Sequence, residues 1–297
     1  MTAPDHTLDF QDHRRELDGN RYVYAVVSRR SRGLSIGVNL NPDKVCNFAC
    51  PYCQVDRTTP GGERAVDLVR LRAELDHLFG LITAGTLWEI PPFSTAKDSF
   101  RRVNDIAFAG DGEPTSCPTF PGAVRAVGEA RAAHGLHDVK VNLLTNATLF
   151  QRPRVQAGLE ALDAIGGEIW AKLDAGTEDY FQLVDGTGLP FRRVLQNIHD
   201  AARLRPIVLQ CMFMTWEGEG PSDAEVAAWA GRIDDLLADG GLVRLVQVYS
   251  VARHPADPRV DALPTPRLEQ LADAARAVVA RHGTGTVVQV YPGIPQS

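Results

Sequence analysis

Three cysteines lie close together near the start of the chain, at Cys46, Cys50 and Cys53. Their Cys-x3-Cys-x2-Cys spacing supplies one thiolate fewer than a closed tetrahedral metal site needs. Thiolates favour zinc and iron–sulfur clusters, and a four-iron cluster held by three cysteines leaves one iron free to bind a molecule that is not protein. The motif therefore predicts an iron–sulfur centre with an open coordination position.

Other uses of these cysteines fit the sequence less well. A structural zinc site normally takes two pairs of ligands, but Cys117 and Cys211 stand alone and the histidines are scattered. A ferredoxin supplies four thiolates to each cluster, so electron transfer alone is also disfavoured. Asn47 and Pro51 mark a loop, which argues against three cysteines buried as small apolar residues.

Segments with strand character alternate with amphipathic segments over most of the chain. The predicted strands are rich in β-branched and aromatic residues and cover 22–27, 34–40, 105–109, 139–145, 168–173, 207–213, 243–248 and 286–291. The predicted helices repeat apolar residues at helical spacing and cover 66–82, 120–133, 152–165, 191–204, 223–238 and 267–281. This order predicts parallel pairing with right-handed crossovers.

The strand before the cysteines opens a series of six β/α units, too few to close an eight-stranded barrel. The strands 22–27 and 34–40 are expected to pair as a hairpin, with Arg29, Arg30 and Arg32 as its solvated tip. The last strand, 286–291, is expected to extend one edge or to close the far end. We expect one domain over 21–297, preceded by a polar extension over 1–20.

In β/α folds the loops after the strands form the active site. The polar residues expected at these strand ends are Gly110, Asp111, Gly112, Glu113, Thr145, Asn146, Lys172, Asp174, Gln210, Gln247 and Tyr249. Lys172 and Asp174 share one face of their strand. An unpaired polar group buried there would cost several kcal/mol, so either a polar cofactor or an internal Lys172–Asp174 pair must satisfy them.

The run Val45-Cys46-Asn47-Phe48-Ala49-Cys50-Pro51-Tyr52-Cys53 resembles the cysteine motif of radical S-adenosylmethionine (radical SAM) enzymes. Further runs at 37–42, 110–115, 144–149, 171–176 and 246–253 look like a branch of small iron–sulfur oxidoreductases related to the enzymes of wybutosine synthesis. The resemblance covers about 22–258. It implies an α/β fold, a partial (β/α)6 TIM-like barrel with an extra C-terminal strand.

The resemblance also implies cofactors and their ligands. Cys46, Cys50 and Cys53 would hold a [4Fe-4S] cluster whose free iron chelates the methionine end of S-adenosyl-L-methionine. The run 110–115 resembles the Gly-Gly-Glu motif that meets the methionine amine, with Asp111 in place of the first glycine. The other cofactor-binding residues expected are Gly110, Gly112, Glu113, Tyr52 beside adenine, Thr145, Asn146, Lys172, Asp174 and Gln210.

The reaction implied is reductive cleavage of S-adenosylmethionine to a 5′-deoxyadenosyl radical, which takes hydrogen from a substrate. An external donor such as flavodoxin or ferredoxin would supply the electron, and no catalytic side chain is predicted beyond the cofactor ligands. A small-molecule or peptide substrate is favoured because the chain shows no clear basic docking surface, while a tRNA-modifying enzyme stays open. A non-catalytic iron–sulfur sensor is the alternative of another class.

Bulk composition limits the class of protein. The chain has 297 residues, a formal net charge of -6 and five cysteines, which argues against a disulfide scaffold. It contains no run of about twenty apolar residues that would span a bilayer. The polar start does not resemble a signal peptide, so we expect a cytoplasmic protein without a membrane partner.

Overall fold

The computed structural model describes residues 19–28, 33–253, 255 and 257–293. These residues divide into two compact units, each described by itself. The β1–β5 unit contains 19–47 and 60–171, and the β6–β9 unit contains 48–59 and 172–293. Residues 1–18 of the extension expected over 1–20 lie outside the described residues, as does the basic tip at Arg29, Arg30 and Arg32.

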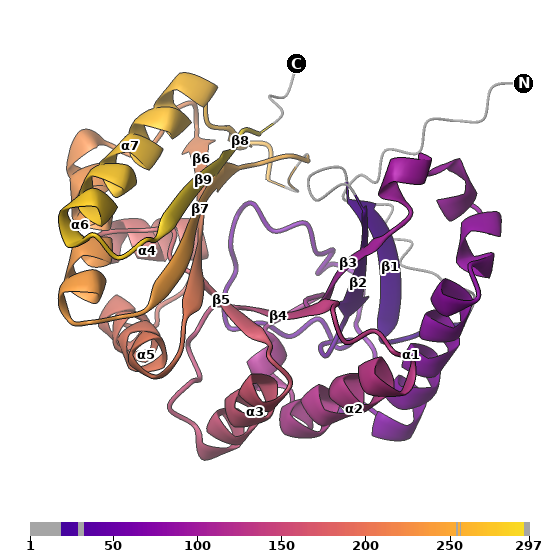
Figure 1. Ribbon diagram of the computed structural model, residues 1–297. Coiled ribbons are helices and arrows are strands. Elements are labelled where there is room, and N and C mark those ends of the chain that lie inside the picture. The colour runs from indigo at the N-terminus through magenta and orange to yellow at the C-terminus, as the bar shows by residue number, and fades with distance from the viewer. Residues whose placement is uncertain (1–18, 29–32, 254, 256, 294–297) are drawn as a thin grey trace, which may run out of the picture. The chain divides into compact units, whose positions relative to one another are not determined.

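The β1–β5 unit carries a mixed sheet covered by helices (Figure 1). Its strands are β1 (Val23–Ser28), β2 (Gly33–Val38), β3 (Val103–Phe108), β4 (Lys140–Thr145) and β5 (Glu168–Lys172, whose last residue is assigned to the other unit). β1 and β2 form the expected antiparallel hairpin. From β2 to β5 each strand is parallel to the next, as the alternation of strands and helices predicts.

The helices of this unit are α1 (Leu68–Thr83), α2 (Phe120–Ala133) and α3 (Pro153–Ala164). Asp67 caps α1 because its carboxylate accepts from the amide of Val69 at 2.9 Å. Short 3₁₀ segments at Thr86–Glu89, Phe93–Thr95, Asp98–Phe100 and Pro114–Ser116 complete the unit. The apolar faces of these helices are buried, which fixes the loops that follow the strands.

The β6–β9 unit contains four helices and four strands within the described residues (Figure 1). The helices are α4 (Glu178–Asp185), α5 (Phe191–Leu204), α6 (Asp223–Ala238) and α7 (Thr265–His282). The strands are β6 (Ile207–Trp216), β7 (Val243–Ser250), β8 (Val260–Ala262) and β9 (Val287–Tyr291). β6, β7 and β9 are parallel neighbours, while β8 pairs antiparallel with the end of β6.

The core of the β6–β9 unit is built around Trp229 of α6. Its indole is fully buried, meets Phe213 edge to face at 5.0 Å between ring centroids, and donates from Nε1 to the carbonyl of Leu173 at 3.1 Å. This bond ties the segment after β5 to the helix layer. The end of β5 and the loops of this unit are therefore held by one packed core.

The sequence predicts most of these elements. Helices α2, α5 and α6 have the bounds predicted for them, and β9 extends the sheet by pairing with β7, one of the two outcomes expected for the last strand. Helix α4 and strand β8 were not predicted, since each is too short for a periodic pattern. No helix within the described ranges has the length and apolar character needed to cross a membrane.

Candidate functional site

Asn39 and two glycines shape the loop after β3 in the β1–β5 unit. Asn39 donates from Nδ2 to the Asp111 carboxylate at 2.7 Å and accepts from the Asp111 amide at 3.1 Å. A Cβ at Gly110 would overlap the Asn39 side chain, and one at Gly112 would overlap the carbonyl of Val45. The glycines are therefore needed for close packing of this loop against the segment that leads to the cysteines.

Glu113 lies under this loop rather than in the open. The residue is 2% exposed, and its carboxylate accepts from the Thr115 amide and hydroxyl at 3.1 and 2.5 Å, and from the Thr145 hydroxyl at 2.6 Å. Its second oxygen accepts from the Asn146 amide at 2.7 Å. Burial raises the pKa of Glu113, against the opposing effect of these bonds. The carboxylate thus joins the loop after β3 to the end of β4.

Asn146 connects the end of β4 to the cysteine loop. Its Nδ2 donates to Asn47 Oδ1 at 2.7 Å, Asn47 Nδ2 donates to the Thr148 hydroxyl at 2.5 Å, and that hydroxyl donates to Asn146 Oδ1 at 2.7 Å. Between them Ala147 has a φ of 58°, a left-handed conformation that only a well-determined turn holds for alanine. This closed ring of hydrogen bonds fixes the residue next to Cys46.

Lys172 is the centre of a buried charged cluster in the β6–β9 unit. Its Nζ lies 2.7 Å from Asp185 Oδ1, 3.2 Å from Asp174 Oδ2 and 3.1 Å from Cys50 Sγ, and it also contacts the Tyr52 hydroxyl. The side chains of Lys172, Asp174 and Asp185 are 16%, 0% and 2% exposed. The internal Lys172–Asp174 pair expected as one alternative is therefore present.

Asp174 and Tyr52 complete this cluster. The Tyr52 hydroxyl donates to Asp174 Oδ2, and the amide of Met212 donates to Asp174 Oδ1 at 2.8 Å. Burial and the Asp174 charge raise the pKa of Tyr52, so the phenol stays protonated and acts as a donor. Asp174 is thus satisfied by neutral donors as well as by Lys172.

The ammonium of Lys172 pairs with two carboxylates, those of Asp174 and Asp185, and this arrangement shifts the pKa values of the group. Burial opposes the charge of Lys172, but Asp174 and Asp185 together raise its pKa well above the ordinary value. Burial raises the pKa of Asp185 to about 6 in spite of Lys172, and raises that of Cys50 to about 12. In this group of buried side chains a charged Lys172 therefore lies beside Cys50, which is a thiol in the absence of metal.

Helix α4 supports the cysteine loop in the same unit. The Ala49 amide donates to the carbonyl of Asp185 at 3.1 Å, and Phe48 meets Phe181 edge to face at 5.6 Å between ring centroids. Gly186, which ends α4 in the left-handed conformation, packs against the Ala49 carbonyl. The last turn of α4 therefore positions the backbone that leads to Cys50.

Sequence reasoning missed Asp185 because it missed α4. A signal was present: Thr177 as N-cap, two acidic residues in the first turn, and Gly186 just after the last turn are typical of a short helix. Gln210, in contrast, was expected within the strand predicted over 207–213, and it lies in β6. Its amide lies 3.5 Å from that of Gln247 on the neighbouring strand, so the structure brings these two amides together.

The cysteines themselves are compatible with iron–sulfur ligation. Cys46, Cys50 and Cys53 are each partly exposed and form no disulfide. Cys53 also has a cationic side chain nearby, because Arg57 Nη2 lies 3.8 Å from its sulfur. Across 19–28, 33–253, 255 and 257–293, no three His, Cys, Asp or Glu side chains already form a metal-holding group. The donor set of three thiols within one loop still fits an iron–sulfur cluster with an open iron.

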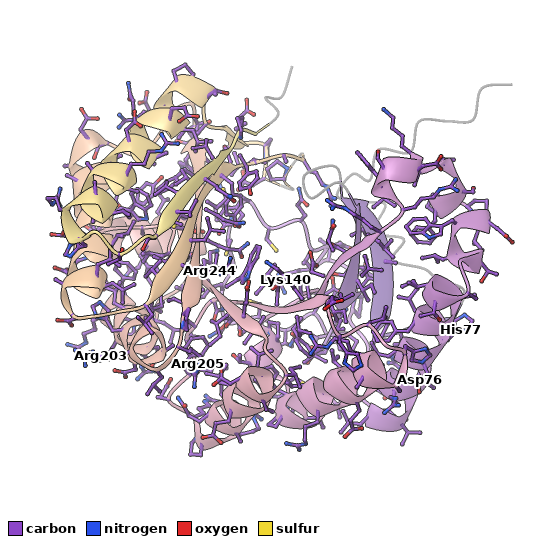
Figure 2. The ribbon with its side chains drawn as sticks, viewed as in Figure 1. Asp76, His77, Lys140, Arg203, Arg205 and Arg244 are labelled. Atoms are coloured by element: carbon purple, nitrogen blue, oxygen red, sulfur yellow. The ribbon has the colours of Figure 1, made fainter. Side chains whose placement is uncertain are left out.

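Basic side chains also occur at the opposite end of the strands. Arg203 near the end of α5, Arg205 just before β6, and Arg244 at the start of β7 lie at the amino ends of the strands (Figure 2). Arg203 pairs with Asp239 at 3.2 Å. These arginines are therefore separate from the strand ends that carry the Lys172 cluster.

The fold is that of an α/β protein whose sheet is mostly parallel, and the chain after β2 carries three cysteines. The chain matches SuiB of Streptococcus suis bound to S-adenosylmethionine with a TM-score of 0.58 and 10% identity, over 88% of this chain and 52% of SuiB. SuiB bound to its precursor peptide SuiA matches with a TM-score of 0.56 and 12% identity, over 87% and 49%. The likeness to SuiB is one of fold, and it confirms the expected α/β fold of parallel strands and helices.

The curated relatives match only part of this chain and part of their own length. A UPF0026 protein of Helicobacter pylori is 25% identical over 183 residues, which cover 59% of this chain and 53% of that protein. A GTPase Obg of Brachyspira hyodysenteriae is 26% identical over 57% of this chain and 21% of its own length. The chain thus spans about half the length of the UPF0026 relative, and it has no Gly-x4-Gly-Lys-Ser/Thr run of a P-loop. No family model matches the chain.

Proposed function

We propose that the chain is a radical SAM enzyme that binds a [4Fe-4S] cluster through Cys46, Cys50 and Cys53. The observation that carries the proposal is the three-thiol donor set on a fold shared with SuiB, whose structure holds S-adenosylmethionine. A bound cluster supplies the electron that cleaves S-adenosylmethionine to methionine and a 5′-deoxyadenosyl radical. The protein orients the substrate and excludes competing reactions.

Two sets of contacts support the role of the loop as a ligand carrier. In the β1–β5 unit, Asn146 and Thr148 hold Asn47, next to Cys46. In the β6–β9 unit, the end of α4 holds Ala49, next to Cys50. A loop restrained at both positions has less conformational freedom to lose when it ligates metal.

Gly110, Asp111 and Gly112 are proposed to meet S-adenosylmethionine through their backbone. All three are half-buried, and the glycines leave their peptide groups uncovered by Cβ atoms. Tyr52, Thr145, Asn146 and Gln210 remain proposed cofactor contacts. Glu113 is proposed to position this loop, since its carboxylate accepts from Thr115 in the loop after β3 and from Thr145 and Asn146 at the end of β4.

A peptide is the favoured substrate class, with a small molecule next. The likeness to SuiB, whose structure holds the precursor peptide SuiA, supports a peptide. The formal net charge of -6 disfavours a polyanionic substrate such as tRNA, because contacts to phosphates require a basic surface. An external one-electron donor such as flavodoxin or ferredoxin is part of this proposal.

The central test is cofactor cleavage. The protein is reconstituted anaerobically with iron and sulfide, reduced with dithionite, and mixed with S-adenosylmethionine; 5′-deoxyadenosine is then measured by mass spectrometry. We expect turnover by the wild type, loss of cluster and product in Cys50→Ala, and retention of both in Cys117→Ala, a matched change at a buried cysteine outside the loop. A protein that holds an intact cluster and forms no 5′-deoxyadenosine would be a sensor or scaffold instead.

The substrate class is tested separately by hydrogen transfer. Peptide libraries and cell extracts prepared in deuterated form are supplied as substrate, and deuterium is sought in 5′-deoxyadenosine. Deuterium from the peptide fraction supports the favoured class. Transfer only from deuterated tRNA, together with salt-dependent tRNA binding, would replace it with the base-modifying alternative.

A further inference from the structure

Lys172 contacts one cysteine of the loop directly. Its Nζ is 3.1 Å from Cys50 Sγ, a distance at which the ammonium donates a hydrogen bond to sulfur. The lysine is 16% exposed, so water does little to weaken its charge at that position. Cys50 thus has a fixed positive charge beside it before any metal binds.

A charge next to a ligating sulfur affects the reduction potential of an iron–sulfur cluster. The reduction potential of an iron–sulfur centre depends on net charge, on hydrogen bonds to the sulfurs and on solvent exposure. A cation that donates to a thiolate stabilises the reduced, more negative state and raises the potential. The position of Lys172 is therefore one that sets how readily the cluster accepts an electron.

Asp185 limits this effect. Its Oδ1 is 2.7 Å from Lys172 Nζ and its side chain is 2% exposed, so it cancels part of the positive charge close to Cys50. Asp174 is 3.2 Å from the same ammonium, but the amide of Met212 and the Tyr52 hydroxyl also donate to it. Asp185 is therefore the carboxylate whose charge most directly opposes that of Lys172 at the sulfur.

Cys53 provides a comparison within the same unit. Arg57 lies farther from its sulfur, at 3.8 Å, and is exposed. Solvent and salt screen an exposed charge much more than a buried one. Neutralising Arg57 should consequently matter less than neutralising Lys172.

We propose that Lys172 tunes the reduction potential of the cluster by donating from Nζ to Cys50 Sγ, with Asp185 setting how much of its charge reaches the sulfur. This inference rests on the proposed function, because it requires a cluster on Cys50. It makes Lys172 and Asp185 positioning residues that act through Cys50 and have opposite effects on the potential.

The test is the midpoint potential of the cluster, measured without substrate. Wild type, Lys172→Gln, Asp185→Asn, the double variant and Arg57→Gln are reconstituted, their iron and sulfide contents are determined, and each is titrated with reductant under electron paramagnetic resonance. We expect a lower potential in Lys172→Gln, a higher one in Asp185→Asn, an intermediate one in the double variant, and a smaller downward shift in Arg57→Gln.

The outcomes separate the inference from the proposed function. If the wild type assembles no cluster, the proposed function fails. If the wild type holds a cluster and cleaves S-adenosylmethionine while the two single variants keep its potential, or both shift in one direction, only the inference fails. Should Lys172→Gln not fold, Asp185→Asn still decides: an unchanged or lowered potential there overturns the role of the pair, and a raised one supports it.

Discussion

Gly186 joins the end of α4 to the cysteine loop, and its replacement by alanine tests that support. The residue has φ 56° and ψ 44°, the left-handed conformation that glycine adopts without cost. A Cβ built there lies less than 3.0 Å from the Ala49 carbonyl, closer than Cβ atoms pack. Gly186→Ala must therefore both strain α4 and displace Ala49.

The expected cost has two parts. Alanine in the left-handed conformation costs about 1–2 kcal/mol. Moving Ala49 also disturbs its hydrogen bond to the Asp185 carbonyl, 3.1 Å in the wild type, which is worth about 0.5–1.5 kcal/mol. Gly186→Ala should thus lose about 1.5–3.5 kcal/mol of folding free energy, and the backbone next to Cys50 should move.

Gly283→Ala is the matched control. Gly283 ends α7 with φ 61°, and a Cβ there meets nothing within 4 Å. It carries the left-handed strain without the overlap, so it should cost about 1–2 kcal/mol. The difference between the two variants isolates the contact with the cysteine loop.

Thermal unfolding and iron content after reconstitution measure the two effects. We expect the Tm of Gly186→Ala to lie about 1–2 °C below that of Gly283→Ala. Only Gly186→Ala should bind less iron per chain. If both variants unfold at the same temperature and bind the same iron as the wild type, α4 does not position the loop.

Three further changes test other parts of the structure. Glu113→Gln replaces an oxygen that accepts from several donors with an NH₂ group, so we expect a loss of about 1–3 kcal/mol in denaturant unfolding and weaker S-adenosylmethionine binding by calorimetry. Asn146→Ala breaks the ring with Asn47 and should lower iron retention during dialysis, whereas Gln196→Ala, at an exposed hydrogen bond on α5, should not. Hydrogen bonds from His282 and Arg281 hold the pKa of Asp234 below its ordinary value of 3.8. The stability that the Asp234 carboxylate contributes is therefore present above pH 3.8 and is lost as the pH falls through the lower pKa of the folded state. The Tm gap between wild type and Asp234→Asn should therefore narrow in acid, and a gap that widens would contradict this.

The sequence determined most of the elements and which residues are candidates for a functional site. Apolar periodicity and β-branched runs predict α2, α5 and α6 to the residue because these helices bury one continuous face. The Cys-x3-Cys-x2-Cys spacing alone indicates an open iron–sulfur centre. Loops after parallel strands share one edge of the sheet, so the candidate residues could be named before any contact was known.

Only the tertiary structure decided which donor meets which acceptor. The Glu113 carboxylate accepts from Thr145 and Asn146 at the end of β4, and the contact between Lys172 and Cys50 joins residues far apart in the chain. Asp185 enters the site through α4, a helix held by Phe48, Phe181 and Gly186 rather than by a long apolar pattern. Such contacts are set by packing between distant segments, which local sequence preferences do not encode.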